Sequence, residues 1–473
     1  MGGEGGAPSR GDLRVRRLCR RPGVHEPGRR ARRGRGPPPR DLPHLGTGDG
    51  EDLDPRHRRA ERERLHPRGQ DRRERGRLLR PAGGPSSGDL PAPGGADLPP
   101  APGLRIRLLD SWHEDPARGS GTAVAISSLA DGLRARGHEV EVLTPAPPLS
   151  PLPHLLRRLA FNVSVRRRLA SRPPDLAVGF DLDGCALPAP GRRSYPLAVS
   201  LKGVAADEAR HERGTAAMQL RILAALEGRS ARGADRVIVP SSYSAAQAAR
   251  AYGLEAGRIS VVPEGIDLGP WNALHDDPPA RDDPRPTILS VARQYPRKNT
   301  RTLLDAIPRV AGVIADVRLR VVGGGPELHR LRERARCLGI AERVEFLGAV
   351  PEREAVRAEY FRADCFCLPS LQEGFGIVFL EAMAAGLPVV AARVAAVPEV
   401  VVDGETGLLV DDPRDPRALA HALLRVLESP ERARDLGRAG RDRARWFGHA
   451  RMADRFLAAV EEIGRTGAPE ERP

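Results

Sequence analysis

The chain has 473 residues, a length that is enough for about three domains. Its formal net charge is +14, and 40% of its residues are hydrophobic and 29% charged. It has no run of about 18 apolar residues and no apolar stretch at the N-terminus, so neither a transmembrane helix nor a secretory signal is expected. Five cysteines do not suffice for a disulfide framework, and they favour a reducing, cytoplasmic setting.

The first hundred residues differ in composition from the rest. They contain 23 arginines, no lysine and no aromatic residue, and with 14 acidic residues they carry 23 − 14 = +9 of the net charge. Such a segment buries too little apolar surface to offset its chain entropy, so we expect residues 1–103 to form a disordered leader. Three interpretations stay open: a wrongly assigned start, a solvated tail, or an RNA-binding segment, for which the base-stacking aromatic residues are missing.

From residue 104 onward, short apolar strands alternate with amphipathic helices. An expected strand over 104–109, a helix over 122–136 that Gly137 ends, and a strand over 139–143 together make a βαβ unit. The rest of this Rossmann-like N-terminal domain, residues 104–271, is expected to contain strands over 176–180, 197–201, 236–239 and 259–262 and a helix over 216–232.

Residues 272–286 are rich in aspartate and proline and predict an interdomain linker. A second alternating series over 287–448 predicts another doubly wound α/β domain, and a C-terminal helix and tail follow over 449–473. Two such domains place a ligand cleft at the carboxyl ends of their strands. The expected strands are 287–291, 317–322, 344–347, 365–368 and 389–391, and the expected helices are 300–313, 327–338, 352–360, 377–385, 416–427 and 450–463.

The strongest functional signal lies in residues 368–386, where two carboxylates flank a strand-to-helix loop. Glu373 precedes the glycines Gly374 and Gly376, and Glu381 lies in the following apolar helix, ~6 Å from its start. A buried carboxylate needs hydrogen-bond partners, and the hydroxyls of a ligand would suit Glu381. The free N–H groups at the helix start favour an anionic ligand. The alternative is that Glu381 caps its own helix or pairs with an arginine.

Two cations follow the first strand of the second domain. Arg293 and Lys298 lie on a loop turned by Pro296, at the carboxyl end of that strand, where they suit a diphosphate group. The chain has only two lysines, Lys202 and Lys298, against 76 − 2 = 74 arginines, so a retained lysine indicates a specific role. The alternative is a pair of solvated loop charges.

A glycine-rich turn, Gly323, Gly324 and Gly325, follows the next strand of the second domain and would let a nucleotide approach the backbone. It does not match the G-x-G-x-x-G dinucleotide fingerprint. Cys365 and Cys367 lie on one face of a strand without a nearby histidine, so we expect them to pack in the core and not to bind zinc.

Together these motifs make residues 104–463 resemble the retaining glycosyltransferases of family-4 type (glycosyl transferases group 1). The resemblance implies a GT-B fold, in which two Rossmann-like domains face a central cleft. It also implies transfer of a sugar from a nucleotide-diphosphate-sugar, UDP- or GDP-linked, to an unknown acceptor that is a glycan, a lipid or a small molecule. Its marks are Glu373-x7-Glu381 with E-G-F-G between, Arg293-x4-Lys298, and the segments 136–144, 234–244 and 262–267.

The resemblance further implies roles for the motif residues. Glu381 would bind the ribose hydroxyls and Glu373 the sugar hydroxyls of the donor. Arg293 and Lys298 would neutralise the diphosphate as it leaves. Backbone contacts to the sugar, the phosphate or the acceptor are implied for Gly374, Phe375 and Gly376 in the second domain and for Gly119 to Gly121 in the first.

The resemblance also implies retention at the anomeric carbon, through a front-face displacement in which the leaving diphosphate helps to take the acceptor's proton. The Asp-x-Asp sequence of metal-dependent transferases is missing from the second domain, because Asp181-Leu182-Asp183 lies in the first. We therefore expect no metal and no cofactor besides the nucleotide-sugar co-substrate.

Two features of the first domain bear on the acceptor. Lys202 follows the strand over 197–201, where the family often has a histidine that faces the sugar; it would bind sugar or phosphate, unless the alignment is displaced by a residue or two. Residues 154–168 are basic and amphipathic, as in segments that dock such enzymes on the inner face of the cell membrane. The alternative is an ordinary solvated helix.

Rival functions stay open. A phosphorylase that binds pyridoxal phosphate through Lys202 or Lys298, or a sugar-nucleotide epimerase, would share the GT-B fold. A protein that binds RNA through its basic leader belongs to a different class, and no specific nucleic-acid partner is expected.

The change in composition near residue 103 predicts that the leader is dispensable. A shortened chain that begins at Pro102 should melt at the same temperature as the full chain and transfer sugar at the same rate. Thermal melting and a transfer assay on both chains test this. Insolubility or inactivity of the shortened chain alone would show that the leader belongs to the folded enzyme.

Overall fold

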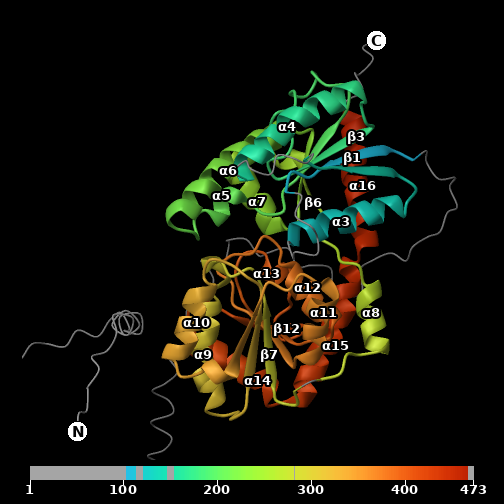
Figure 1. The fold of residues 1–473 in the computed structure, drawn as a ribbon. Helices are drawn as coiled ribbons and strands as arrows, with labels where there is room; N and C mark the ends of the chain where they lie inside the picture. Colours follow the sequence, from blue (N-terminus) through green and yellow to red (C-terminus); the bar gives the residue numbers. More distant parts are fainter. Residues whose placement is uncertain (1–102, 113–120, 146–153, 282, 467–473) are drawn as a thin grey trace, which may run out of the picture. The chain divides into compact units, whose positions relative to one another are not determined.

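The computed structural model describes residues 103–112, 121–145, 154–281 and 283–466, which contain two parallel six-stranded sheets with helices packed on both faces (Figure 1). This arrangement confirms the predicted GT-B fold. The leader and Gly119 lie outside the described residues. No described helix is long and apolar enough to cross a bilayer.

The first sheet has the strand order β2-β1-β3-β4-β5-β6, and every neighbouring pair is parallel. Because both faces of a parallel sheet are covered, the inner strand β3 is a continuous apolar run, and all five of its residues are buried. The strands are β1 (Arg105–Leu109), β2 (Glu139–Leu143), β3 (Leu176–Phe180), β4 (Leu197–Ser200), β5 (Arg236–Val239) and β6 (Ile259–Val261).

Helices cover the two faces of the first sheet from different parts of the chain. One face carries α4 (His154–Ser171), α6 (Gly214–Gly233) and α7 (Ser242–Tyr252), and the short α5 (Ala205–Glu208) packs beside α6. The other face carries α3 (Gly121–Arg134) and α16 (His449–Thr466).

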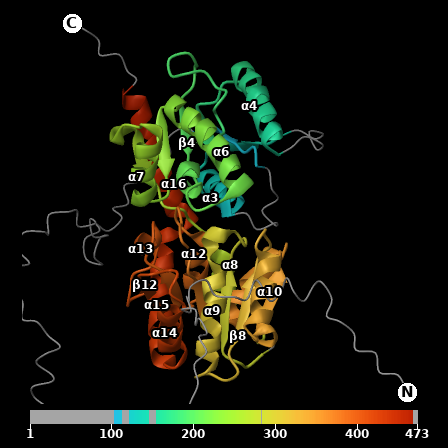
Figure 2. The same cartoon turned by 90° about the vertical axis from the view of Figure 1, so that its left-hand side faces the viewer.

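The second sheet has the order β12-β11-β10-β7-β8-β9, again entirely parallel. The expected burial of Cys365 and Cys367 in its core is confirmed. The strands are β7 (Thr287–Val291), β8 (Arg318–Val322), β9 (Val344–Gly348), β10 (Cys365–Leu368), β11 (Val389–Ala392) and β12 (Gly407–Val410). The helices are α9 (Thr300–Ala311), α10 (Leu328–Cys337), α11 (Arg353–Arg362), α12 (Ile377–Ala384), α13 (Val397–Val400), α14 (Pro416–Leu427) and α15 (Pro430–Ala444), seen from the side in Figure 2.

Residues 272–276, which we interpreted as the start of a linker, belong instead to helix α8 (Gly269–Asp276). The helix is held by Trp271, whose ring packs edge-on against Tyr360 with centroids 5.5 Å apart. Trp271 is the one buried residue of this short helix, which is too short to show a helical periodicity in the sequence.

Helix α15 was not predicted, because its sequence is dominated by charged residues. It packs on α12 through glycines and not through an apolar stripe. A Cβ atom at Gly437 would lie 2.1 Å from the carbonyl oxygen of Gly386, and one at Gly440 would lie 3.1 Å from the Met383 side chain. Close backbone approach of this kind leaves no hydrophobic pattern in the sequence.

The C-terminal helix α16 returns to the first domain and completes its core (Figure 1, red). The chain crosses over through backbone hydrogen bonds from His449 N to Ile266 O, 3.0 Å, and from Ile266 N to Phe447 O, 2.9 Å. The residues of α16 buried in this core are Met452, Ala453, Phe456, Ala459 and Val460.

Truncation of Phe456 should therefore destabilise the first domain. The side chain is 1% exposed, and Phe456→Ala should lower the free energy of unfolding by about 3–5 kcal/mol. Glu461→Ala, exposed on the same helix, is the matched control and should change it by less than about 0.5 kcal/mol. Urea unfolding followed by circular dichroism measures both, and equal effects would contradict the placement of α16 in the core.

Candidate functional site

A cavity of about 1050 Å³ lies where the carboxyl ends of the strands of both sheets face each other. The residues that follow β1, β3 and β4 line it from the first domain, and those that follow β7, β8 and β10 line it from the second. Parallel strands bring their carboxyl ends to one edge, so motifs distant in sequence meet here. The predicted site residues in the lining are Gly121, Lys202, Arg293, Gly323, Gly324, Gly325, Lys298, Glu373, Gly374, Phe375, Gly376 and Glu381.

Glu373 and Lys298 form an ion pair inside this cavity. Lys298 Nζ lies 2.7 Å from Glu373 Oε1, and the hydroxyl of Ser370 donates to the same oxygen at 2.7 Å. Glu373 is only 6% exposed, so the pair is shielded from bulk water. Asn299, with a φ of +56°, turns the chain from the Lys298 loop into α9 and donates to Pro369 O at 3.0 Å, which fixes this loop to the one that carries Glu373.

Gly376 makes the turn from the Glu373 loop into α12. Its φ is +93°, and a Cβ atom at this position would lie 2.5 Å from the ring of Phe379. Only glycine fits this conformation. No side chain caps the N-terminus of α12, so its first N–H groups remain at the cavity wall that Gly376, Ile377 and Val378 form.

Glu381 lies on the cavity side of α12 and is partly exposed to the cavity. The hydroxyl of the buried Tyr360 donates to its Oε2 at 2.8 Å. Glu381 therefore pairs with a tyrosine and neither caps its own helix nor forms an ion pair with an arginine, which were the alternatives. Burial raises the pKa of Glu381, although Tyr360 and the nearby Arg353 and Arg357 oppose that shift.

The glycine-rich turn borders the cavity, but two of its glycines are required by close packing against the protein's own backbone. A Cβ atom at Gly323, φ +117°, would lie 1.9 Å from Ala292 O, and one at Gly325, φ +154°, would lie 2.6 Å from Gln294 N. The turn thus packs against the backbone of the loop that carries Arg293. Gly324, with its nearest neighbour 3.5 Å away, is the least crowded of the three.

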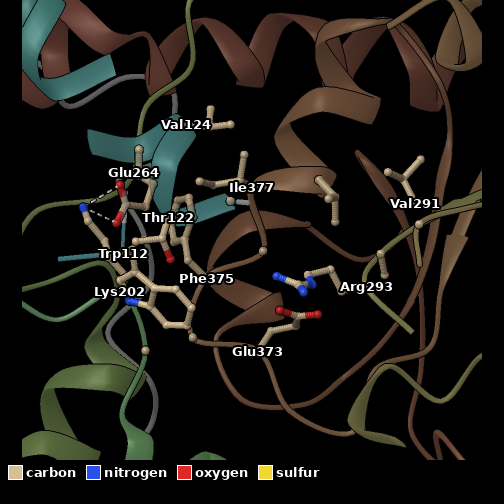
Figure 3. A pocket seen from close by; sticks show the side chains of 18 of the residues that line it. Trp112, Thr122, Val124, Lys202, Glu264, Val291, Arg293, Glu373, Phe375 and Ile377 are labelled. Atoms are coloured by element: carbon tan, nitrogen blue, oxygen red, sulfur yellow. Dashed lines mark hydrogen bonds and ion pairs between the residues drawn. The ribbon is translucent and has the colours of Figure 1, made fainter. Parts of the chain in front are cut away.

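Lys202 is engaged in a second buried ion pair, with Glu264. Its Nζ lies 2.8 and 3.1 Å from the two carboxylate oxygens, and the two side chains are 9% and 5% exposed. Glu264 belongs to the segment 262–267 that marked the family, but its pairing with Lys202 spans 62 residues and no local pattern predicts it. Figure 3 shows this pair and Trp112 on one side of the cavity and Arg293 and Glu373 on the other.

Residues of the first domain also form hydrogen bonds with the Glu373 loop of the second domain. The hydroxyls of Ser241 and Ser244 both donate to the carbonyl oxygen of Gly374, at 2.8 and 3.0 Å. The Gln372 side chain donates to Asp207 at 3.2 Å. Ser241 and Ser244 lie in the family segment 234–244, although the sequence alone assigned them no function.

A carboxylate of the second domain completes this contact. Glu399 accepts the backbone N–H groups of Ser242 and Tyr243 at 2.8 and 2.9 Å, at the N-terminus of α7. A negative charge at a helix N-terminus satisfies free N–H groups and the helix dipole together. The first turn of α7 is thus hydrogen-bonded both to the carbonyl oxygen of Gly374 and to the carboxylate of Glu399.

The wall beside β1 and β3 contains a polar cluster that the sequence did not reveal. Asp183 accepts hydrogen bonds from Ser111 N and Asn162 Nδ2, both at 2.8 Å, and Arg158 Nε donates to Ser111 Oγ at 2.8 Å. Burial raises the pKa of Asp183 to about 6. Within the described residues, no group of three or more histidine, cysteine or acidic side chains is arranged to hold a metal ion.

Comparison with known proteins agrees with this geometry. Residues 119–269 match the family described as Glycosyltransferase Family 4, and residues 273–443 match Glycosyl transferases group 1. A GDP-mannose-dependent alpha-(1-6)-phosphatidylinositol monomannoside mannosyltransferase of Mycolicibacterium smegmatis is 37% identical over 223 residues. That match covers 44% of this chain and 57% of the relative, so the chain spans little more than half of that protein's length.

A longer match reaches across both domains. The phosphatidyl-myo-inositol mannosyltransferase of Mycobacterium leprae is 32% identical over 386 residues, which cover 77% of this chain and 98% of that protein. Among solved structures, the sucrose-phosphate synthase of Thermosynechococcus elongatus superposes with a TM-score of 0.65 and 25% identity, over 76% of this chain and 99% of that one.

The Anabaena protein HepE, solved in complex with UDP-glucose, superposes with a TM-score of 0.56 and 22% identity, over 76% of this chain and 100% of that one, which shows likeness of fold. Each domain thus matches a glycosyltransferase family model, one relative matches across both domains, and both sheets match the architecture of the solved structures. The chain therefore belongs to the family-4 glycosyltransferases with the GT-B fold.

Proposed function

We propose that this protein is a retaining, metal-independent glycosyltransferase that uses a nucleotide-diphosphate-sugar. The observation that carries the proposal is the arrangement of Glu373, Lys298, Glu381 and Arg293 around one cavity at the carboxyl ends of β7 and β10. Two carboxylates that would bind hydroxyl groups and two cations that would contact a diphosphate thus line one ligand-sized space.

The reaction follows from the charges of these side chains. The bond between the anomeric carbon and the phosphate oxygen breaks, and the acceptor oxygen bonds to the same face of that carbon. Negative charge develops on the leaving diphosphate, where Arg293, Lys298 and the N–H groups at the start of α12 would stabilise it. The acceptor's proton passes to the leaving diphosphate.

The Lys298–Glu373 pair would hold both side chains in position before the donor binds. When a diphosphate contacts Lys298, Glu373 can exchange part of this contact for a hydroxyl of the sugar. Because the pair is already desolvated, little reorganisation is needed at the moment of reaction.

We propose GDP-mannose as the donor, because the mycobacterial relative that is 37% identical is named as GDP-mannose-dependent. A UDP-sugar is the alternative, since HepE of the same fold was solved with UDP-glucose. Glu381 would bind the ribose, which both nucleotides share.

For the acceptor we propose an inositol-containing headgroup, as in the names of these relatives. Membrane contact at the inner face of the cell membrane through residues 154–168 is part of this proposal. On α4, Leu156 and Val163 are exposed together with the cations Arg166, Arg167 and Arg168, while the opposite face of the helix packs in the core. Exposed apolar and basic residues on one helix suit an anionic lipid surface.

The pyridoxal-phosphate alternative receives no support from the lysines. Both Lys202 and Lys298 are paired with glutamates, so an aldehyde would have to displace a carboxylate before either amine could form a Schiff base.

Substitution of Lys298 tests the diphosphate contact. Lys298→Ala should weaken GDP binding by about ten- to a hundredfold, the value of a charge-assisted hydrogen bond, and leave guanosine binding unchanged. Arg301→Ala, exposed on the adjacent helix α9, is the control and should leave both unchanged. Isothermal titration calorimetry measures the four affinities. Equal loss for GDP and guanosine would place Lys298 away from the phosphates.

Chelation and product stereochemistry test the mechanism. Mannosyl transfer should persist in excess EDTA, because the proposed counter-charges are Arg293, Lys298 and the start of α12. The product should keep the α linkage of the donor, as measured by the one-bond carbon–proton coupling at the anomeric carbon. Activity that EDTA abolishes and magnesium or manganese restores would contradict metal independence, and a β-linked product would contradict retention.

A further inference from the structure

Arg158 is a buried cation of the cavity that forms no ion pair with the described residues. Arg158, on α4, is 2% exposed and lines the cavity from the first domain. Its Nε donates to Ser111 Oγ at 2.8 Å, and its guanidinium carbon lies 4.5 Å from the centroid of the Trp112 ring. Its Nη2 is buried and has no hydrogen-bond partner among the described residues.

The acidic side chains beside Arg158 are committed elsewhere. Both oxygens of Asp183 accept other donors, from Ser111 N and Asn162 Nδ2, and Asp181 Oδ1 accepts Lys202 N at 2.8 Å. No carboxylate oxygen of the described residues lies within 4.0 Å, the distance of an ion pair, of the Arg158 guanidinium nitrogens. Burial raises the pKa of Asp183 more than the charge of Arg158 lowers it, which agrees with incomplete compensation between the two.

A buried guanidinium with an unpaired N–H is costly unless a ligand supplies the missing acceptor. The planar guanidinium, held against the Trp112 ring, offers a fixed fork of donors, which matches the oxygens of a phosphate group better than a single ammonium does. The other cation on this wall, Lys202, is already neutralised by Glu264. Arg158 is therefore the group of the first-domain wall that is suited to an anion.

A phosphate at Arg158 would be distinct from the diphosphate of the donor. Arg293 and Lys298, which the proposed function assigns to the donor, belong to the second domain, whereas Trp112 lies on the opposite side of the cavity (Figure 3). An anion bound at Arg158 would thus belong to the other substrate.

We propose that Arg158 binds a phosphate ester of the acceptor, next to the hydroxyl that receives the sugar. The proposal rests on the proposed function, because it presumes a donor in the second domain and an acceptor in the first. The phosphate ester belongs either to a phospholipid headgroup or to a soluble phosphorylated polyol, and the two share the chemistry that Arg158 recognises.

The binding experiment uses the full chain saturated with GDP. Isothermal titration compares myo-inositol 1-phosphate, unphosphorylated myo-inositol and inorganic phosphate with wild type, Arg158→Met, Arg158→Lys and the control Arg250→Met. Arg250 is exposed on α7, outside residues 154–168, and does not line the cavity. Arg158→Met should weaken binding of the phosphorylated polyol about ten- to a hundredfold, and Arg158→Lys should restore part of it. Myo-inositol should bind all four proteins alike, and Arg250→Met should behave as wild type.

A transfer assay separates the two sources of the phosphate. Wild type is given the same donor with either myo-inositol 1-phosphate or vesicles of phosphatidylcholine that contain phosphatidylinositol. Whichever acceptor is used, Arg158→Met should lower kcat/KM for it by about the same factor as it lowers affinity. Thermal melting of each variant shows whether it is folded. If Arg158→Met does not fold, the comparison of wild type with Arg158→Lys still tests the proposal.

Three results would overturn the proposal while leaving the proposed function intact: no affinity of wild type for any phosphorylated probe although GDP binds, unchanged affinity in Arg158→Met, or equal loss of phosphorylated and unphosphorylated probes. Failure of wild type to bind GDP would instead contradict the proposed function itself.

Discussion

The geometry of the cavity depends on how the loop Glu373–Gly376 is held. Lys298 and Ser370 fix the carboxylate of Glu373 from the second domain, and Ser241 and Ser244 of the first domain fix the carbonyl of Gly374. The carboxylate and the carbonyl belong to consecutive residues, so rotation of this loop would break contacts in both domains. A change in the separation of the domains would therefore alter the position of the Glu373 carboxylate, because the same loop is hydrogen-bonded to both domains.

Two buried ion pairs lie in the wall of the cavity. Each of the two lysines of the chain is bound to a buried glutamate. An ammonium concentrates its charge in a small volume, which suits a short contact with one carboxylate, whereas a guanidinium spreads it over a wide fork. This difference gives a physical reason for two lysines among so many arginines. Arg158 is buried and forms no ion pair with the described residues, so it suits a substrate that brings its own negative charge.

Most of the fold could be predicted because the sheets are parallel and covered on both faces. Buried strands such as β3 and β10 are uninterrupted apolar runs whose ends the sequence marks clearly. The missed elements include the short apolar strand β12 and the helices α7, α8 and α15. Of these, α8 and α15 bury little apolar surface of their own: α8 depends on Trp271, and α15 packs through Gly437 and Gly440. Their stability comes from neighbours far away in the chain, so local periodicity does not report them.

For the candidate site, the sequence by itself determined which residues stand at the carboxyl ends of β7, β8 and β10, because motif spacing and strand direction are local properties. Arg293, Lys298, Glu373 and Glu381 were found in this way. Only the tertiary structure decided which partner each charge takes. Lys202 pairs with Glu264 across 62 residues, Ser241 donates to Gly374 across 133, and Arg158 donates to Ser111 across 47. Such contacts arise from the meeting of surfaces, and no periodicity within either segment encodes them.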